Sequence, residues 1–295
     1  MRILSKLVAW SLLSLGLLAA AAGRGDADFI YAADGQAGNP ATNLYIINTA
    51  DGNVATTVGS IGFAVTGMAF NPTTGVLYGV SAPKGTGTRQ LITINTTTGA
   101  GTVVRALGVT IDEISFASDS TLFAWSGRTS GSSLYRINLT TGAATQVSLS
   151  GLTDFGVGFA INQTTGQAFL ANAGASGVLR TVNLTTGAAT PGPTLTGAPF
   201  PTGSIDAMAF DGSTLLALNL NETGPGGSGN APSATFLVSI NPTTGAVTTL
   251  GPSVPGLDAL AFQPGTTVVP EPSSLLLCLV GAIGLIGRSW WRRIR

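Results

Sequence analysis

Histidine is absent from this chain of 295 residues, and its single cysteine, Cys278, lies in an apolar stretch near the C-terminus. The body of the chain therefore forms no internal disulfide and no zinc site built from Cys and His ligands. It also lacks the Ser–His and Cys–His couples on which many hydrolases depend. These exclusions require no assumption about the fold.

Charged residues are scarce as well, at 9% of the sequence. Between residues 28 and 269, six basic residues stand against eleven acidic ones, a net charge of about −5, whereas the two ends of the chain are basic. Binding to nucleic acid needs a basic patch that replaces the counterions of the phosphates, so we expect no nucleic-acid partner.

Glycine is abundant, with 41 residues, and Ser, Thr and Asn fill the spaces between short apolar runs. This composition favours short strands joined by tight turns over helices. The hydrophobic content of 44% supplies enough apolar surface for a core, so we expect the body to be folded.

The N-terminal residues have the layout of a secretory signal peptide. Two basic residues, an apolar stretch from Leu7 to Leu18 and a run of alanines follow one another in residues 1–22. The apolar stretch is shorter than the roughly 20 residues of a membrane span. We predict a signal helix within residues 1–27 that signal peptidase removes, with cleavage at Ala21–Ala22 or at Ala27; a retained anchor is the alternative.

The C-terminal residues, 268–295, combine a Pro-Glu-Pro triplet, an apolar segment from Leu275 to Gly287 and a terminal arginine cluster with two tryptophans. Physically, this pattern predicts a short transmembrane helix with interfacial Trp and a positive cytoplasmic end. The order of the three parts resembles the PEP-CTERM sorting domain. The residues that carry the resemblance are Pro270, Glu271, Pro272, Arg288, Arg292 and Arg293.

The resemblance implies a processing route. In that family an exosortase, a membrane cysteine protease, cuts near Pro-Glu-Pro and passes the protein to the cell surface or the extracellular matrix of Gram-negative bacteria that make exopolysaccharide. We therefore expect residues 266–295 to form a sorting tail that anchors the chain transiently in the inner membrane. The alternative is an ordinary C-terminal anchor, and both place the body outside that membrane.

Between the two ends the sequence repeats itself. An apolar strand, then Asn, then a turn ending in Gly recurs five times, at intervals of 47, 43, 45 and 57 residues, and the longest interval contains an insertion at 221–233. In these turns the Asn side chain can cap the backbone, and Gly accepts a positive φ. The five copies are 44–52, 91–99, 134–142, 179–187 and 236–245.

A second phrase, typified by VTGMAFNPTTGVLYGV (65–80), alternates with the first and contributes two strands to each unit. Its fifth copy, LDALAFQP (257–264), lacks the second strand, which is instead present at the start of the body as DFIYAAD (28–34). Each unit therefore holds four strands, and the last unit is shared between the two ends of the body.

Four strands in each repeat of about 40–50 residues is typical of a propeller blade. We predict an all-β fold over residues 28–265: a five-bladed β-propeller of four-stranded blades, in which residues 257–262 join residues 28–58 and close the ring. Closure removes two exposed sheet edges. The strand rhythm resembles YVTN/NHL-like propellers; a pair of β-sandwiches or an open β-solenoid is the alternative.

Acidic residues recur at one position of the repeat. In related propellers the first strand of the second phrase, the MAF-type strand, is innermost. The residues that begin this strand would therefore line one mouth of the central channel. Carboxylates gathered there repel one another unless they are hydrated, protonated or bridged by a cation such as Ca²⁺. We predict a metal site at Asp112, Asp206 and Asp258; the alternative is that each Asp caps its own turn. The aligned residues are Thr66, Asp112, Val157, Asp206 and Asp258, with Glu113 and Asp154 close by.

Aromatic residues offer a second candidate site. Their faces can stack on sugars, but residues on strands are also expected to pack between blades, and Trp125 is the only Trp of the body. The candidates are Phe63, Tyr78, Phe123, Trp125, Tyr135 and Phe155.

We interpret the chain as an exported, non-enzymatic protein of the cell surface or extracellular matrix that binds polysaccharide or protein within an exopolysaccharide or biofilm matrix. No cofactor is expected apart from Ca²⁺. The alternative is a metal-dependent propeller enzyme, similar to a lactonase or a lyase, that uses the channel carboxylates; a third reading is a purely structural repeat.

Overall fold

The computed structural model describes residues 29–35, 42–81, 89–127, 131–149, 152, 158–171, 177–200, 203–221 and 234–263. These residues belong to one compact unit, Phe29–Pro264. The signal peptide predicted at 1–27 and the sorting tail predicted at 266–295, with all six of its motif residues, lie outside the described residues. Within the described part of the chain, no helix has the length and apolar character needed to cross a membrane.

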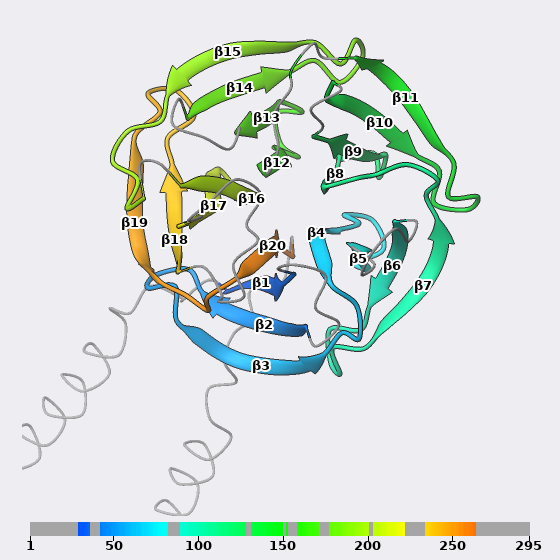
Figure 1. The fold of residues 1–295 in the computed structure, drawn as a ribbon, viewed down its shortest axis with the longest axis horizontal. Helices are drawn as coiled ribbons and strands as arrows, with labels where there is room; N and C mark the ends of the chain where they lie inside the picture. The colour runs from blue at the N-terminus through cyan, green and yellow to red at the C-terminus, as the bar shows by residue number, and fades with distance from the viewer. Residues whose placement is uncertain are drawn as a thin grey trace, which may run out of the picture. The chain divides into compact units, whose positions relative to one another are not determined.

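The described residues form twenty strands in five four-stranded antiparallel sheets, which stand as blades around a common axis (Figure 1). This confirms the predicted five-bladed propeller. Blade 1 is β20-β1-β2-β3, blade 2 is β4 to β7, blade 3 is β8 to β11, blade 4 is β12 to β15 and blade 5 is β16 to β19. The bounds are β1 Phe29–Asp34, β2 Asn43–Asn48, β3 Val54–Ser60, β4 Val65–Phe70, β5 Leu77–Ser81, β6 Gln90–Ile94, β7 Gly101–Ala106, β8 Glu113–Phe116, β9 Leu122–Ser126, β10 Ser133–Ile137, β11 Ala144–Leu149, β12 Gly158–Ile161, β13 Ala168–Ala171, β14 Val178–Val182, β15 Ala189–Thr194, β16 Ser204–Asp211, β17 Thr214–Leu220, β18 Thr235–Ile240, β19 Val247–Pro252 and β20 Leu257–Ala261.

Blade 1 is built from both ends of the body, as the repeat analysis predicted. β20 pairs antiparallel with β1, and the register places Tyr31 opposite Ala261 and Ala33 opposite Ala259. The first and last strands therefore hydrogen-bond to each other, and the ring has no open gap between blades 5 and 1.

Burial falls from the axis outward. The five strands that begin each blade, β4, β8, β12, β16 and β20, are almost wholly buried and adjoin one another around the axis. The outermost strands β3, β7 and β15 are largely exposed, and each contains Thr among small or β-branched residues that suit that position. The first strand of each second phrase, typified by MAF at 68–70, is thus innermost, as expected.

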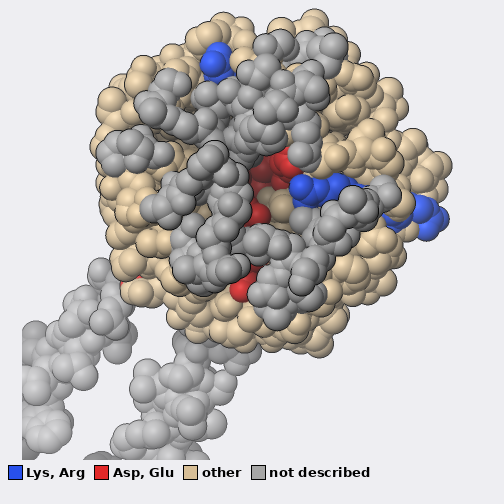
Figure 2. Space-filling model, in the orientation of Figure 1, with Lys and Arg blue, Asp and Glu red and all other residues tan. Residues whose placement is uncertain are grey.

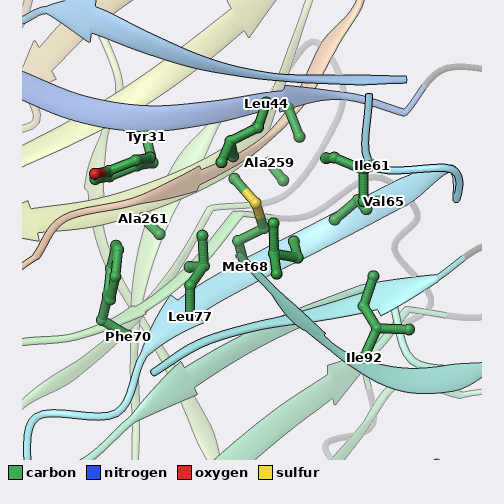
Figure 3. Packing of buried hydrophobic residues seen from close by; sticks show 12 residues of the cluster. Tyr31, Leu44, Ile61, Val65, Met68, Phe70, Leu77, Ile92, Ala259 and Ala261 are labelled. Atoms are coloured by element: carbon green, nitrogen blue, oxygen red, sulfur yellow. The ribbon is translucent and has the colours of Figure 1, made fainter. Parts of the chain in front are cut away.

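The hydrophobic core consists of five clusters, each between two neighbouring blades. Figure 3 shows the cluster between blades 1 and 2, where Tyr31, Met68 and Phe70 meet small residues of β20. The rings of Tyr31 and Phe70 lie 5.3 Å apart in an edge-on arrangement that aromatic pairs prefer. Each blade is therefore stabilised by its neighbours, since a single sheet has no core of its own.

Seven turns that begin with Asn and end with Gly connect the first to the second strand, or the third to the fourth, within the blades. In the turn from Asn95 to Gly99, the Asn95 Oδ1 accepts hydrogen bonds from the backbone N–H groups of Thr97 and Thr98 at 2.9 Å, and the Gly99 N–H donates to the Asn95 carbonyl. Gly99 has a φ of 82°, which a residue with a side chain adopts only at a cost. In an antiparallel blade both kinds of turn follow strands that run in the same direction, and we call these turns together the turn end. Because the blades are twisted, the turns between third and fourth strands lie at the rim, against the outer strand of the preceding blade. The mouth end is where the innermost strands, such as β16 and β20, begin.

Candidate binding site at the mouth end

Acidic side chains gather at the centre of the mouth end, over the axis of the ring, and basic side chains lie beside them (Figure 2). Of the five aligned positions, four are described: Thr66 is in β4, Asp112 directly precedes β8, Asp206 is in β16 and Asp258 is in β20. Val157 and the nearby Asp154 lie outside the described residues.

Glu113 is the focus of this group. Its side chain is 1% exposed, and Asp258, Asp112 and Asp206 all act on it electrostatically. We call Asp112, Glu113, Asp206 and Asp258 the acid cluster. These four residues come from blades 1, 3 and 5, so acids from different blades lie close enough to act on Glu113.

The pKa of Glu113 is raised well above its ordinary value. Burial is the largest cause because it disfavours the charged form, and the negative charge of Asp258 comes next. A hydrogen bond from the Ile114 N–H to Glu113 Oε2, at 3.2 Å, acts in the opposite direction. Glu113 therefore holds its proton to higher pH than an exposed glutamate does.

The other Glu113 oxygen, Oε1, is buried and makes no hydrogen bond to any described residue. Buried acceptors without a partner are rare in folded proteins because each one loses its hydration without compensation. This atom is therefore a buried polar atom without a hydrogen-bond partner among the described residues, and it becomes a free acceptor when Glu113 ionises.

Small residues surround Glu113 at its own level of the axis. The equivalent positions in the other four blades are Gly67, Gly158, Ala207 and Ala259. A Cβ on Gly67 would lie 2.9 Å from the Glu113 Cα and 3.1 Å from Oε1. A side chain at position 67 would therefore compete with Glu113 for the same space.

Asp112 holds two neighbouring parts of the mouth end together. Its Oδ2 accepts a 2.7 Å hydrogen bond from the Gly127 N–H, at the end of β9, and its Oδ1 accepts one from Arg89 Nη2 at 3.3 Å. Arg89 also donates through Nη1 to the Thr66 hydroxyl at 3.2 Å. Asp112 therefore bonds to groups remote in sequence, in contrast to the local turn cap that was the alternative prediction.

The mouth end carries a second acid whose pKa is raised by burial, Asp34 at the end of β1. Its Oδ1 accepts a 2.6 Å hydrogen bond from the Asn43 N–H, which joins the last residue of β1 to the first of β2. Asp258 lies close to this junction, because a Cβ on Gly35 would be 2.9 Å from Asp258 Oδ2.

The metal site predicted at Asp112, Asp206 and Asp258 stays a prediction. Among the described residues, no three His, Cys, Asp or Glu side chains are arranged to hold a metal ion. Ca²⁺ takes oxygen ligands at about 2.3–2.6 Å, which requires closely spaced carboxylates.

The aromatic candidates are packed between blades rather than displayed on a surface. Trp125 is fully buried and stacks on Phe159 of blade 4 with ring centres 6.0 Å apart, and Tyr78 packs on Phe116 of blade 3 at 5.6 Å. Phe123 is 4% exposed and lies under the Arg136 guanidinium. Phe63 and Tyr135 pack against blade-interface clusters, and Phe155 lies outside the described residues.

Sequence reasoning named Glu113 only as a neighbour of Asp112 and did not identify its depth or its small surroundings. The signal was present one position further along the repeat, where Gly67, Gly158, Ala207 and Ala259 are the equivalents of Glu113. Arg89 carries no comparable signal, because it precedes β6 in a segment that the repeat does not constrain.

No protein-family model matches the sequence, and no curated protein matches it either. Solved structures do resemble the fold. TolB from Acinetobacter baumannii superposes with a TM-score of 0.50 at 17% identity, covering 83% of this chain and 58% of the TolB chain. A chain of a nidogen–laminin complex gives 0.50 at 11% identity, covering 79% and 97%. A putative TolB from Agrobacterium tumefaciens gives 0.47 at 10% identity, covering 81% and 95%.

This chain thus spans little more than half the length of the first TolB. At such identities the first two likenesses concern the fold alone. Together with the strand order, they identify the described body as a β-propeller.

Proposed function

We propose that this chain is an exported, non-enzymatic binding protein of the bacterial cell surface or extracellular matrix, whose ligand, a matrix polysaccharide or a surface protein, binds at the mouth end. The observation that carries the proposal is the acid cluster, in which four carboxyl groups from three blades meet at one place. Bringing carboxyl groups together in a buried place destabilises the folded state, because the groups repel one another and lose hydration. A ligand therefore explains their position better than the needs of the fold do.

The distribution of regular and irregular connections also supports a binding site at the mouth end. Seven turns of the turn end are near-identical Asn-to-Gly turns. The sequences that link β1 to β2, β5 to β6, β9 to β10, β13 to β14 and β17 to β18 differ in length and composition, and the strand ends that they link lie at the mouth end. The insertion at 221–233 falls between β17 and β18, whose facing ends lie at the mouth end. Variable segments on a rigid scaffold are where binding sites usually lie.

Export rests on the two ends of the sequence. A signal peptide at the start and a Pro-Glu-Pro, apolar and arginine-rich tail at the end support delivery to the cell surface. Changing Pro270, Glu271 and Pro272 to alanine should leave the chain in the inner-membrane fraction of an exosortase-containing host, whereas the unchanged chain reaches the surface or medium. Equal release of both chains would contradict sorting through this motif.

The binding proposal is tested with the full chain, purified after export from a Gram-negative host, on an array of bacterial glycans and by capture of surface proteins. We expect binding that is lost when Asp112, Asp206 and Asp258 are all changed to Asn. The matched control is Asp51→Asn, which removes one exposed carboxylate at the turn end and should leave binding intact. Silence in both assays would favour a purely structural role.

One observation favours a second candidate, a carboxylate-based hydrolase. A protonated Glu113 beside ionised aspartates resembles the acid and base pairs of enzymes that cleave glycosidic bonds. Glu113 is 1% exposed, however, and an acid catalyst must reach the bond that it protonates. Release of reducing ends from any glycan bound on the array, lost in Glu113→Gln, would support the enzyme instead.

A further inference from the structure

We propose that the acid cluster binds a primary ammonium group at the end of a slender aliphatic chain, of the kind that a lysine side chain carries, with Glu113 as the innermost hydrogen-bond acceptor. The inference rests on the proposed function and deepens it, because it names the chemical group by which a protein ligand would be held.

The first support is the Glu113 Oε1 atom. It belongs to a residue that is 1% exposed, no described residue bonds to it, and it is an acceptor in the ionised form of Glu113 that a bound cation favours. A ligand that donates a hydrogen bond there would remove the penalty of a buried, unsatisfied oxygen. The rest of the acid cluster consists of acceptors too, since ionised carboxylates donate no hydrogen bonds.

The second support is the charge of the group. Three aspartates and a glutamate meet at the mouth end, and Arg89, through its contact with Asp112, is the base that the described residues place against them. A guanidinium of the chain's own thus already bridges the edges of blades 2 and 3 by the chemistry that we propose for the ligand. The remaining members, Asp206 and Asp258, belong to blades 5 and 1 on the other side of Glu113.

The third support is the shape of the cluster. Asp112 is partly buried, whereas Asp206 is 8% exposed and Glu113 is 1% exposed, so Glu113 is the deepest of the three. The residues equivalent to Glu113 in the other blades are glycine or alanine, and one of them, Gly67, lies directly against it without a side chain. An alkyl chain with a terminal ammonium group is narrower than a sugar ring, so it is the ligand that we expect to reach so deeply buried a group.

An ammonium group also suits the spacing better than a metal ion does. No three acidic side chains among the described residues are arranged for a metal. Charge-assisted N–H···O bonds are longer than Ca²⁺–oxygen contacts, about 2.7–2.9 Å against about 2.3–2.6 Å, so more widely spaced oxygens can share one ammonium. A primary ammonium offers three donors and no acceptor.

Binding is expected to strengthen as pH rises. The charged groups that face Glu113 are Asp112 on its own segment, Asp206 of β16 and Asp258 of β20, with Arg89 beside Asp112; the described neighbours on β4 and β12 are glycines. A bound cation favours the ionised form of Glu113, so it competes with the proton that burial and the aspartates retain. Ammonium binding should therefore release a proton, and the proton becomes harder to displace in acid.

The test is isothermal titration of the full, exported chain with 1,5-diaminopentane and with Nα-acetyl-lysine methylamide, in buffers from mildly acidic to mildly alkaline. The neutral control ligand is 1,5-pentanediol, which has the same length. We expect saturable amine binding with proton release, and about a tenfold loss of affinity in Glu113→Gln, as for one charge-assisted hydrogen bond. Asp258→Asn, a change nearer the surface, should weaken binding as well, while Asp51→Asn should not.

Four results would overturn the inference: no amine binding, equal binding of the diol, an equal loss in Asp51→Asn, or binding of Ca²⁺ or of a glucosamine oligomer in place of the alkylamine. Thermal melting of each variant separates lost binding from lost folding. If amines fail to bind but the triple Asn variant still loses a glycan or protein ligand, this inference fails and the proposed function stands. If amines bind and no macromolecule does, the reverse holds.

Discussion

The pKa values of carboxyl groups are shifted in opposite directions at the two ends of the propeller. At the turn end, hydrogen bonds from Asn53 lower the pKa of Asp51, and hydrogen bonds from Thr121 lower that of Asp119. At the mouth end, burial raises the pKa of Asp34 and, with the neighbouring aspartates, that of Glu113. Acidic side chains thus cap local turns at one end, where hydrogen bonds favour their ionised form. At the other end, burial disfavours the ionised form.

The contrast teaches which part of the sequence serves the fold and which does not. Turn-end residues repeat from blade to blade and satisfy their own backbone, so substitutions there should reduce stability. Mouth-end residues break the repeat, so substitutions there should alter pH response and binding more than folding. Sites that serve function commonly reduce stability in this way.

The largest expected effect is at the turn end, in Gly99→Ala. A Cβ at Gly99 would lie 2.5 Å from the Gly59 carbonyl oxygen of blade 1, and its φ of 82° already disfavours alanine. We expect a loss of about 2–4 kcal/mol of unfolding free energy, measured with urea.

Gly75→Ala is the matched control for Gly99→Ala. Gly75 ends an equivalent turn with a φ of 68°, but nothing lies within 4 Å of its added Cβ. It should lose only about 1–2 kcal/mol, from backbone strain alone. Equal losses at the two glycines would show that docking on the preceding blade contributes nothing.

The next largest effect concerns the asparagines that begin the same two turns. Here we expect the larger loss of stability in the turn that ends at Gly75, the reverse of the order for the glycines. Asn71 is 4% exposed, and its Oδ1 accepts hydrogen bonds from two backbone N–H groups and from the Ser120 hydroxyl of blade 3. Asn95 is exposed and accepts the two backbone bonds only. Asn71→Ala should lose about 2–3 kcal/mol and Asn95→Ala about 1 kcal/mol, since water replaces the lost partner at the exposed site. Urea unfolding of both variants checks the order, which a larger loss at Asn95 would contradict.

A change of pH should have a smaller effect on the free energy of unfolding, and the effect should be opposite in sign for acids at the two ends. Glu113 binds its proton more tightly in the folded state, so stability falls as pH rises from the ordinary glutamate pKa through the raised one. Asp51 and Asp119 have lowered pKa values, so their contribution is lost as pH falls. Glu113→Gln should flatten the decline of unfolding free energy on the alkaline side, measured by urea titration across pH. A decline that persists unchanged in Glu113→Gln would assign it to another group.

The smallest effect is a displacement of that decline in Asp258→Asn. Asp258 is the strongest charge acting on Glu113, so its neutralisation should lower the pKa of Glu113 and end the decline at a lower pH. The same titration made on Asp51→Asn is the control, since that residue lies at the other end. An identical displacement in both variants would show that the net charge of the protein, rather than proximity, sets the pKa.

The fold could be predicted from the sequence because the same pattern of strands and turns recurs in each blade. The Asn-to-Gly turns and the alternating phrases predicted four strands per unit, and the missing strand of the phrase at 257–264 predicted the pairing of β20 with β1. Closure followed from counting strands, which needs no knowledge of side-chain contacts.

The site was only partly accessible, because its properties arise between blades. Asp112, Asp206 and Asp258 could be aligned by the repeat, but the burial of Glu113 depends on small residues in four other blades. Identical turns at Gly75 and Gly99 likewise differ only in what lies beside them. Sequence periodicity predicts each blade, and the neighbouring blade decides what each residue does there.

The register of the closing strands has one more consequence. Phe29 lies opposite Asn48, and Ala261 lies opposite Tyr31, so the described chain both enters and leaves the propeller on the side of the Thr-Thr-Gly loops. A group attached to the described chain at Phe29 or after Ala261 would therefore start from the face opposite the acid cluster. Such an attachment would leave the face that carries the acid cluster unobstructed.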